Sequence, residues 1–278
     1  RKHGLRTIID FVPNHVARSY ASDVRPELSF GEGDRRDVFF DRDNPSSVAS
    51  CITAARENGR IVRTALTTQV WDALNTAFQE LRQIEAKRSK AELSRLTDWV
   101  MKQAAMVRGA IDGTILRNDG FNFLNIGYYL ERGDATARLM DVKYYVLLPR
   151  AEYIGTGLDN DQWLMLLRGL GAHRAFHWAY GGEVTSAKIA HFLILNPQSP
   201  RSLITCVAGL NNHLMRLAKA YGRETPAQAA SAHLLAGLEG LSTDHIFDEG
   251  LHEFLTRFIT ESAALGGVIR DSYLSGDM

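Results

Sequence analysis

Apolar residues recur at three- and four-residue spacing over most of this chain, from about residue 45 to its end. Such spacing places the apolar side chains on one face of an α-helix, which can then pack against a neighbour. Stripes of this kind occupy residues 48–62, 71–81 and 93–111, and a longer helical stretch covers residues 118–148 before Pro149. The pattern predicts a series of amphipathic helices.

Local signals predict where several of these helices begin and end. Asn44-Pro45 and Thr225-Pro226 each have the pattern of a helix N-cap followed by proline in the first helical position. Further signals predict a start at Asn160, stops at Gly171 and Gly181-Gly182, and a final helix capped by Thr243 that runs towards Leu274. Because so many apolar stripes must be buried, we expect a mainly α fold, an antiparallel helical bundle.

The first 44 residues follow a different pattern. Residues 5–12 form a β-branched and apolar run typical of a strand buried on both faces, and Pro13 ends it. Residues 23–43 are rich in glycine and charge, which indicates a loop. We therefore expect two parts: a short strand-and-loop fragment of α/β-barrel type over residues 1–44 and a helical domain over residues 45–278.

The segment from Gly4 to His15 resembles the first conserved region of the α-amylase family of glycoside hydrolases. The resemblance implies that Asn14 helps to bind calcium, that His15 lines a sugar subsite and that Asp10 supports the site. Glycoside hydrolysis needs further carboxylates, and no later segment resembles those that supply them in this family. A catalytically incomplete glycoside hydrolase remnant is therefore the alternative function for the chain.

The helical part contains an internal repeat. Pro45-Ser46-Ser47-Val48 corresponds to Pro200-Arg201-Ser202-Leu203, 155 positions later, and Cys51 and Cys206 keep the same register. The repeat predicts a duplicated helical unit. Because its first copy lacks the helices that precede the second, we expect an exposed apolar bundle face and self-association through that face.

Four segments, residues 55–63, 129–144, 172–176 and 247–254, together resemble the alpha-E family. This is a bacterial all-helical domain named for a Glu-Arg motif, here Glu131-Arg132. The resemblance covers about residues 43–278. It implies an accessory component that occurs beside ATP-grasp peptide-ligase-like and transglutaminase-like proteins, with a role in peptide modification. We expect a helical accessory or binding protein with no independent enzymatic activity and no cofactor.

A row of charged residues is the main candidate site. Glu131, Asp134, Arg138 and Asp141 share one face of a helix, and the apolar residues around them predict a partly buried ion network. The network either fixes the register of the helices, binds a ligand or partner, or takes part in catalysis. With the residues that the family resemblance adds, the candidate set is Arg56, Asn58, Arg63, Glu131, Arg132, Asp134, Arg138, Asp141 and His173.

Other combinations have the spacing of metal sites. His173 and His177 are four residues apart, and Glu249-x-x-His252 has the spacing of di-iron bundles. No further ligands accompany either pair in the sequence, so we expect packing roles and no metal. Cys51 and Cys206 lie on apolar stripes, where we expect small core residues rather than nucleophiles.

Composition limits the partners. Lys plus Arg and Asp plus Glu both number 32, so the formal net charge is zero, which argues against nucleic acid or an anionic membrane. Only two cysteines are present, which suits a reducing cytoplasm. No apolar run approaches the ~20 residues that span a bilayer. We expect a cytoplasmic protein.

Overall fold

The computed structural model describes residues 39–87, 93–142, 157–182 and 184–273, and over these residues the secondary structure is helical, with no strand. This confirms the mainly α fold. The predicted strand and the amylase-like residues Asp10, Asn14 and His15 lie outside the described residues. No described helix combines the length and the apolar character that crossing a bilayer requires.

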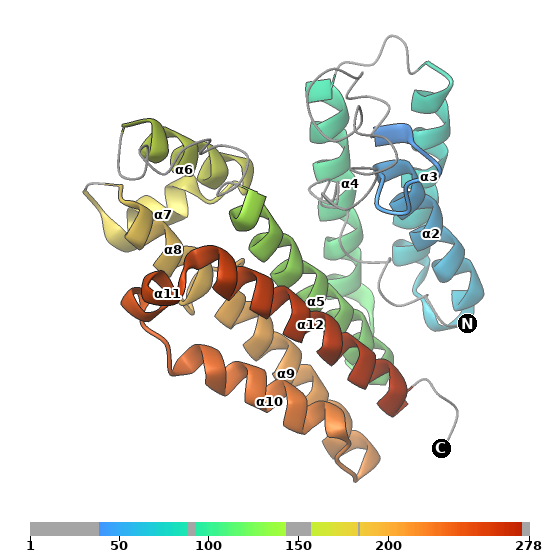
Figure 1. Cartoon of the computed structure of the whole chain (residues 1–278). Helices are drawn as coiled ribbons and strands as arrows, with labels where there is room; N and C mark the ends of the chain where they lie inside the picture. Colours follow the sequence, from blue (N-terminus) through green and yellow to red (C-terminus); the bar gives the residue numbers. More distant parts are fainter. Residues whose placement is uncertain (1–38, 88–92, 143–156, 183, 274–278) are drawn as a thin grey trace. The chain divides into compact units, whose positions relative to one another are not determined.

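Figure 1 shows the helices in chain order. They are α2 (Val48–Ile61), the short 3-10 helix η2 (Arg63–Ala65), α3 (Thr68–Glu85), α4 (Leu93–Thr114), α5 (Asp119–Val142), α6 (Gly157–Gly169), α7 (His173–Tyr180), α8 (Ser186–Ile194), α9 (Leu203–Tyr221), α10 (Pro226–Glu239), α11 (Thr243–Glu249) and α12 (Leu251–Tyr273). The chain divides into two compact units between Tyr128 and Tyr129, within α5.

The first unit is built on α2, α3 and α4. Helix α3 packs against both of the others, and the apolar stripes meet between them at buried residues such as Ile52, Leu74 and Val100. A polar contact accompanies this packing, because Glu80 of α3 accepts hydrogen bonds from the indole of Trp99 and the amide of Gln103.

Residues 39–44 also contribute to the first unit. Phe39 and Phe40 are buried. The guanidinium of Arg42 donates to the carbonyl of Ala49 at 3.0 Å and pairs with Glu85 at 2.6 Å. The residues just before position 45 are thus fixed to α2 and to the end of α3.

Two helix starts differ from the sequence-based expectation. Helix α2 is capped by Ser47, not by Asn44, because the Asn44 side chain accepts from the Ser46 amide at 2.8 Å and so forms a turn of its own. The predicted N-cap at Asn44 and first-turn proline at Pro45 are therefore wrong. Thr225 and Pro226 do begin α10, with a capping box to Gln228, as predicted.

The expected final helix is in fact two helices. Ser242 rather than Thr243 caps α11, and Gly250 separates α11 from α12 with a φ of 99°. This conformation strains residues that carry a Cβ, so glycine suits the break. Likewise α6 begins at Gly157, before the predicted start at Asn160.

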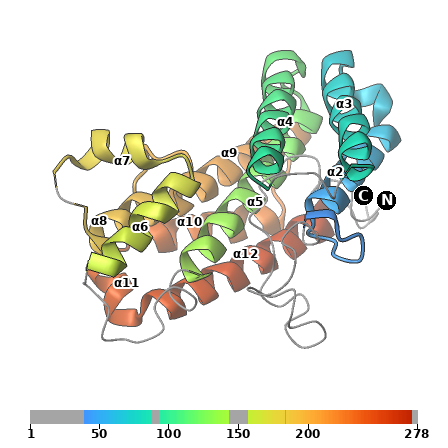
Figure 2. The same ribbon diagram turned by 90° about the horizontal axis from the view of Figure 1, so that it is seen from above.

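The second unit is built on α9, α10 and α12, with the part of α5 that follows Tyr128. Helix α10 packs against both α9 and α12, and the three lie side by side in Figures 1 and 2. Helix α5 reaches α9 and α12 through Gly133, where a Cβ would lie 3.4 Å from Cys206 and 3.7 Å from Phe258. Helices α6, α7, α8 and α11 form a smaller cluster joined to α9 through α8.

The two copies of the predicted repeat have matching local structure. Ser47 begins α2 and Ser202 begins α9, with φ and ψ of −65° and 153° in the first and −65° and 150° in the second. Each hydroxyl accepts from the amide three residues later. One turn on, Cys206 is buried as expected for a core residue, whereas Cys51 is only partly buried. The duplication itself stays a prediction, as does self-association.

Candidate functional site

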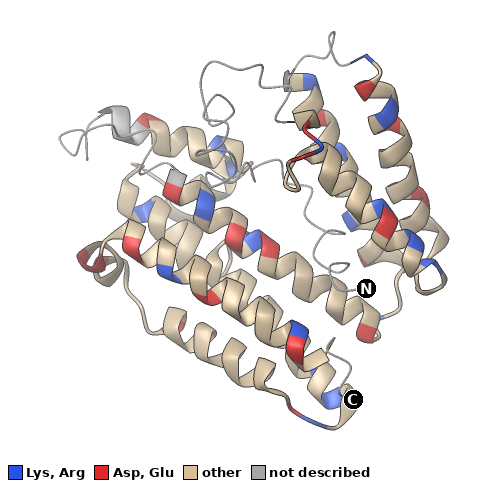
Figure 3. Cartoon of the chain, turned by 45° about the vertical axis from the view of Figure 1, so that its right-hand side comes forward, with Lys and Arg blue, Asp and Glu red and all other residues tan. Residues whose placement is uncertain are grey.

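Helix α5 carries the predicted row of charges and has no strongly solvent-exposed residue between Phe121 and Asp141. Because this part of α5 is surrounded by protein on all sides, charged side chains on it need partners. The charges of α5 are partly buried, at Glu131, Arg132, Asp134, Arg138 and Asp141. Elsewhere acidic and basic residues are interspersed along the helices (Figure 3).

Two ion pairs organise this row. Arg138 donates to the Asp134 carboxylate at 2.8 Å, one turn away on the same helix. Asp141 reaches the Nδ1 atom of His252 at 2.6 Å and so connects α5 with α12. Arg138 keeps 41% of its side-chain surface exposed, whereas Asp134, Asp141 and His252 keep between 21% and 25%. The row is therefore held in place and still accessible to another molecule.

The Glu131-Arg132 pair lies at the start of this row. Arg132 donates to the carbonyl of Pro200 at 3.2 Å, in the segment that leads into α9. Its role in the fold is to join α5 to the start of α9. Glu131 is half-buried beside it.

Arg56 and Arg63 belong to the first unit. Arg56 pairs with Glu57 at 2.5 Å, donates to the Asn75 side chain at 3.4 Å and lies over the rings of Trp71 and Phe78. Arg63 donates to the Leu66 carbonyl and lies over Trp71 at 5.3 Å.

Asn58 closes α2. Its carbonyl accepts from the Val62 amide at 3.2 Å, where α2 ends. Within the first unit these residues fix the end of α2 against α3. The predicted joining of Arg56 and Asn58 to the charges of α5 stays a prediction.

The acid between the two arginines of α2 is perturbed. Hydrogen bonds from Arg60 and then from Arg56 hold the pKa of the Glu57 carboxyl below its usual value, because they stabilise the carboxylate. This cluster is on the surface and shows the chemistry of a charged helix face rather than of a catalytic acid.

His173 lies at the start of α7, one turn before His177. The two Nε2 atoms are 3.3 Å apart, and the rings meet edge to face. Between them in the sequence, Phe176 is fully buried.

The spacing Glu249-x-x-His252 does not make a metal site. Gly250 places Glu249 on α11 and His252 on α12, and Glu249 instead pairs in bidentate fashion with Arg257 at 2.9 and 2.7 Å. Among the described residues, no three or more histidine, cysteine or acidic side chains gather as metal ligands do.

The structure adds a site that sequence analysis did not find. The phenol of Tyr180 is hydrogen-bonded to Nδ1 of His191 and accepts from the Asn196 amide at 3.1 Å. Burial raises the pKa of Tyr180 above its ordinary value of 10.0, only partly offset by the Asn196 hydrogen bond. These residues are 11 and 16 positions apart and share no helix face, so no periodic signal links them.

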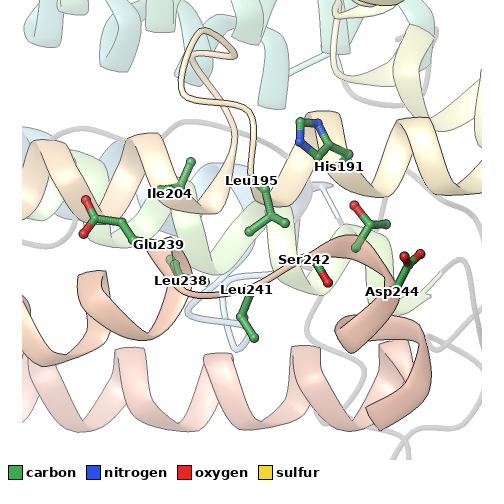
Figure 4. Close-up of a pocket in the computed structure, with 9 residues that line it drawn as sticks. His191, Leu195, Ile204, Leu238, Glu239, Leu241, Ser242 and Asp244 are labelled. Carbon is green, nitrogen blue, oxygen red and sulfur yellow. The ribbon is translucent and has the colours of Figure 1, made fainter.

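His191 of this group lines a pocket of about 490 Å³ in the second unit. The lining comes from α8 and the residue that follows it, from α9, from the end of α10 and from the turn into α11 with the start of that helix (Figure 4). The lining residues are His191, Leu195, Ile204, Leu238, Glu239, Leu241, Ser242, Thr243 and Asp244. The lining thus mixes apolar side chains with polar and acidic ones, so a ligand that carries both kinds of group matches it best.

A comparison with known families gives one match. A family described as a predicted alpha-helical domain with a conserved ER motif matches residues 15–274. The range begins inside the segment expected to resemble α-amylases, and that resemblance has no support among the comparisons. No curated protein and no solved structure matches the chain significantly.

Proposed function

Because the chain belongs to the alpha-E family, we propose that it is a helical accessory protein without catalytic activity of its own. Its partner is an ATP-grasp peptide-ligase-like protein or, in a second arrangement, a transglutaminase-like protein. Its location is the cytoplasm, which suits its two cysteine thiols. The protein acts by binding this partner or the peptide that the partner modifies.

The observation that carries the proposal is the half-exposed ion row of α5. Asp134 and Arg138 are paired and oriented before any partner arrives, and Arg138 still presents 41% of its side chain to solvent. Charges arranged in this way favour one partner over others, because a wrong partner meets like charges or unpaired ones. Their position on a buried helix limits the entropy lost when a partner binds.

The pocket beside His191 supports the peptide part of the proposal. A pocket of about 490 Å³ lies within the range that small ligands occupy. Leu195, Ile204 and Leu238 offer an apolar surface to one side chain, while Glu239 and Asp244 offer carboxylates to an amino group. A short peptide end with one apolar residue fits this combination.

The proposal is tested by capturing partners with the tagged full chain from a lysate of its source and identifying them by mass spectrometry. The informative variant is Arg138→Glu, which replaces the cation with a carboxylate and places that carboxylate against Asp134. Arg270→Glu is the matched control, because Arg270 is an exposed arginine of α12 in the same unit.

We expect an ATP-grasp-type protein with the wild type and the control, and little with Arg138→Glu. Circular dichroism melts establish that both variants are folded. Recovery of neither an ATP-grasp-type nor a transglutaminase-like protein by the wild type would refute the proposal.

A further inference from the structure

His173 and His177 present their Nε2 atoms to the same small volume beside α7. The atoms are 3.3 Å apart, the ring centroids are 4.6 Å apart and the ring planes meet at 69°. At this distance one imidazole can donate a hydrogen bond to the other. The same separation also matches a second arrangement, in which both nitrogens face one ion.

Zinc is held tetrahedrally by histidine nitrogens at about 2.0–2.1 Å. The edge of such a tetrahedron, which is the distance between two ligand nitrogens, is then about 3.3–3.4 Å. The observed separation of 3.3 Å between the Nε2 atoms of His173 and His177 therefore has the size needed for both to bind one ion. Residues four apart share a helix face, so the backbone of α7 needs no change.

The packing of α7 holds this face in place. Phe176, between the two histidines, is fully buried and meets Phe192 of α8 edge to face at 5.6 Å. Its ring also contacts His177 edge to face at 5.7 Å and stacks on Tyr180 at 5.1 Å. Because His177 rests on a fixed aromatic ring, less side-chain entropy is lost when it becomes a ligand.

We propose that His173 and His177 form a binding site for a borderline transition-metal ion, Zn²⁺ or Cu²⁺, with both Nε2 atoms as ligands. Water completes the coordination, because no cluster of three or more metal-ligating side chains occurs among the described residues. Nitrogen ligands select against Mg²⁺ and Ca²⁺, which prefer oxygen. Cu²⁺ binds more tightly than Zn²⁺, as the general order of divalent affinities requires. The site does not depend on the proposed partner.

The test is titration of the metal-free full chain with CuCl₂, ZnCl₂ and MgCl₂ by isothermal calorimetry. His173→Ala and His177→Ala remove one ligand each. His233→Ala is the control, because His233 is an exposed histidine on α10, outside the cluster. We expect one ion per chain, tighter binding of Cu²⁺ than of Zn²⁺, no response to Mg²⁺, and at least a tenfold loss of affinity in either cluster variant alone.

A second readout locates the ion. Trp178 follows His177 directly and is 85% exposed, so bound Cu²⁺ should quench its fluorescence, and Trp178→Phe should remove most of the quenching. This fluorescence signal locates the ion independently of the affinities measured for the histidine variants. Equal affinity in wild type, His173→Ala and His177→Ala, or quenching that survives in Trp178→Phe, would overturn the proposal and indicate adventitious surface binding.

Discussion

The ring of Tyr129 on α5 lies directly over Gly209 on α9. A Cβ at position 209 would come within 2.6 Å of the tyrosine Cζ, closer than real Cβ contacts allow. The absence of a side chain at Gly209 therefore sets how closely these two helices approach. His213, one turn further along α9, stacks on the same ring at 5.9 Å.

We predict that Gly209→Ala destabilises the protein. The methyl group forces the Tyr129 ring to move, and overpacking of this kind costs about 1–3 kcal/mol. The matched control is Gly267→Ala on α12, where a Cβ would meet nothing within 4 Å. There the better helix propensity of alanine should raise stability by about 0.5–1 kcal/mol. Urea denaturation followed by circular dichroism measures both, and equal effects would contradict the close approach.

The two serine caps give a second prediction. Ser47→Ala and Ser202→Ala should each lower the free energy of unfolding, because a lost N-cap costs about 0.5–2 kcal/mol. The loss should be larger at Ser202, whose fully buried hydroxyl also donates to the Asn196 carbonyl at 2.7 Å. Thermal melts check the order, with the exposed Thr260→Ala on α12 as control. A smaller loss at Ser202 than at Ser47 would disagree with this geometry.

The hydroxyl of Tyr180 gives a third prediction. Tyr180→Phe removes a hydrogen-bond partner from the partly buried His191 and from the buried Asn196, and a buried polar group left without a partner costs about 1–3 kcal/mol. The pKa of this phenol is raised in the folded state, so its contribution to stability is complete below the unfolded value of about 10. It is lost as the pH rises through the folded pKa.

Absorbance titration at alkaline pH checks the shift. In the wild type one tyrosine should ionise later than the others while the protein stays folded, and this late step should be missing in Tyr180→Phe. A variant with an unchanged titration curve would show that another tyrosine is responsible.

Glu57 gives a prediction with the opposite sign. Its pKa is lowered in the folded state by Arg60 and Arg56, so its stabilising effect is present above the unfolded carboxyl value of about 4.3. The effect is lost as the pH falls through the folded pKa. Glu57→Gln should therefore lower the melting temperature slightly at pH 7 and leave it unchanged near pH 2. An equal change at both values would exclude the ion pair as the cause.

The helices could be predicted from sequence because their signals are local. Buried residues such as Leu74 of α3, Val100 of α4 and Leu210 of α9 each belong to an apolar stripe with helical spacing. Periodicity alone identifies such stripes. Helix ends were less predictable, since Asn44-Pro45 and Ser47 are competing caps and only their hydrogen bonds decide between them. The break at Gly250 depends on a backbone conformation that a glycine permits but does not require.

The candidate site was predicted only in part. The spacing of Asp134 and Arg138 predicts that they share a face of one helix, and in the structure they pair there. The partner of Asp141 is His252, more than a hundred residues away, and no sequence spacing predicts such a contact. The same holds for Tyr180 and His191, which meet only because α7 packs against α8.

The most direct measurement is the affinity between the purified full chain and an ATP-grasp-type protein from the same organism, by biolayer interferometry. We predict saturable binding that Arg138→Glu weakens at least tenfold and that Arg270→Glu leaves unchanged. Binding that is equal in both variants would exclude the α5 ion row as the contact surface. No binding of the wild type to this protein or to a transglutaminase-like protein would contradict the accessory function itself.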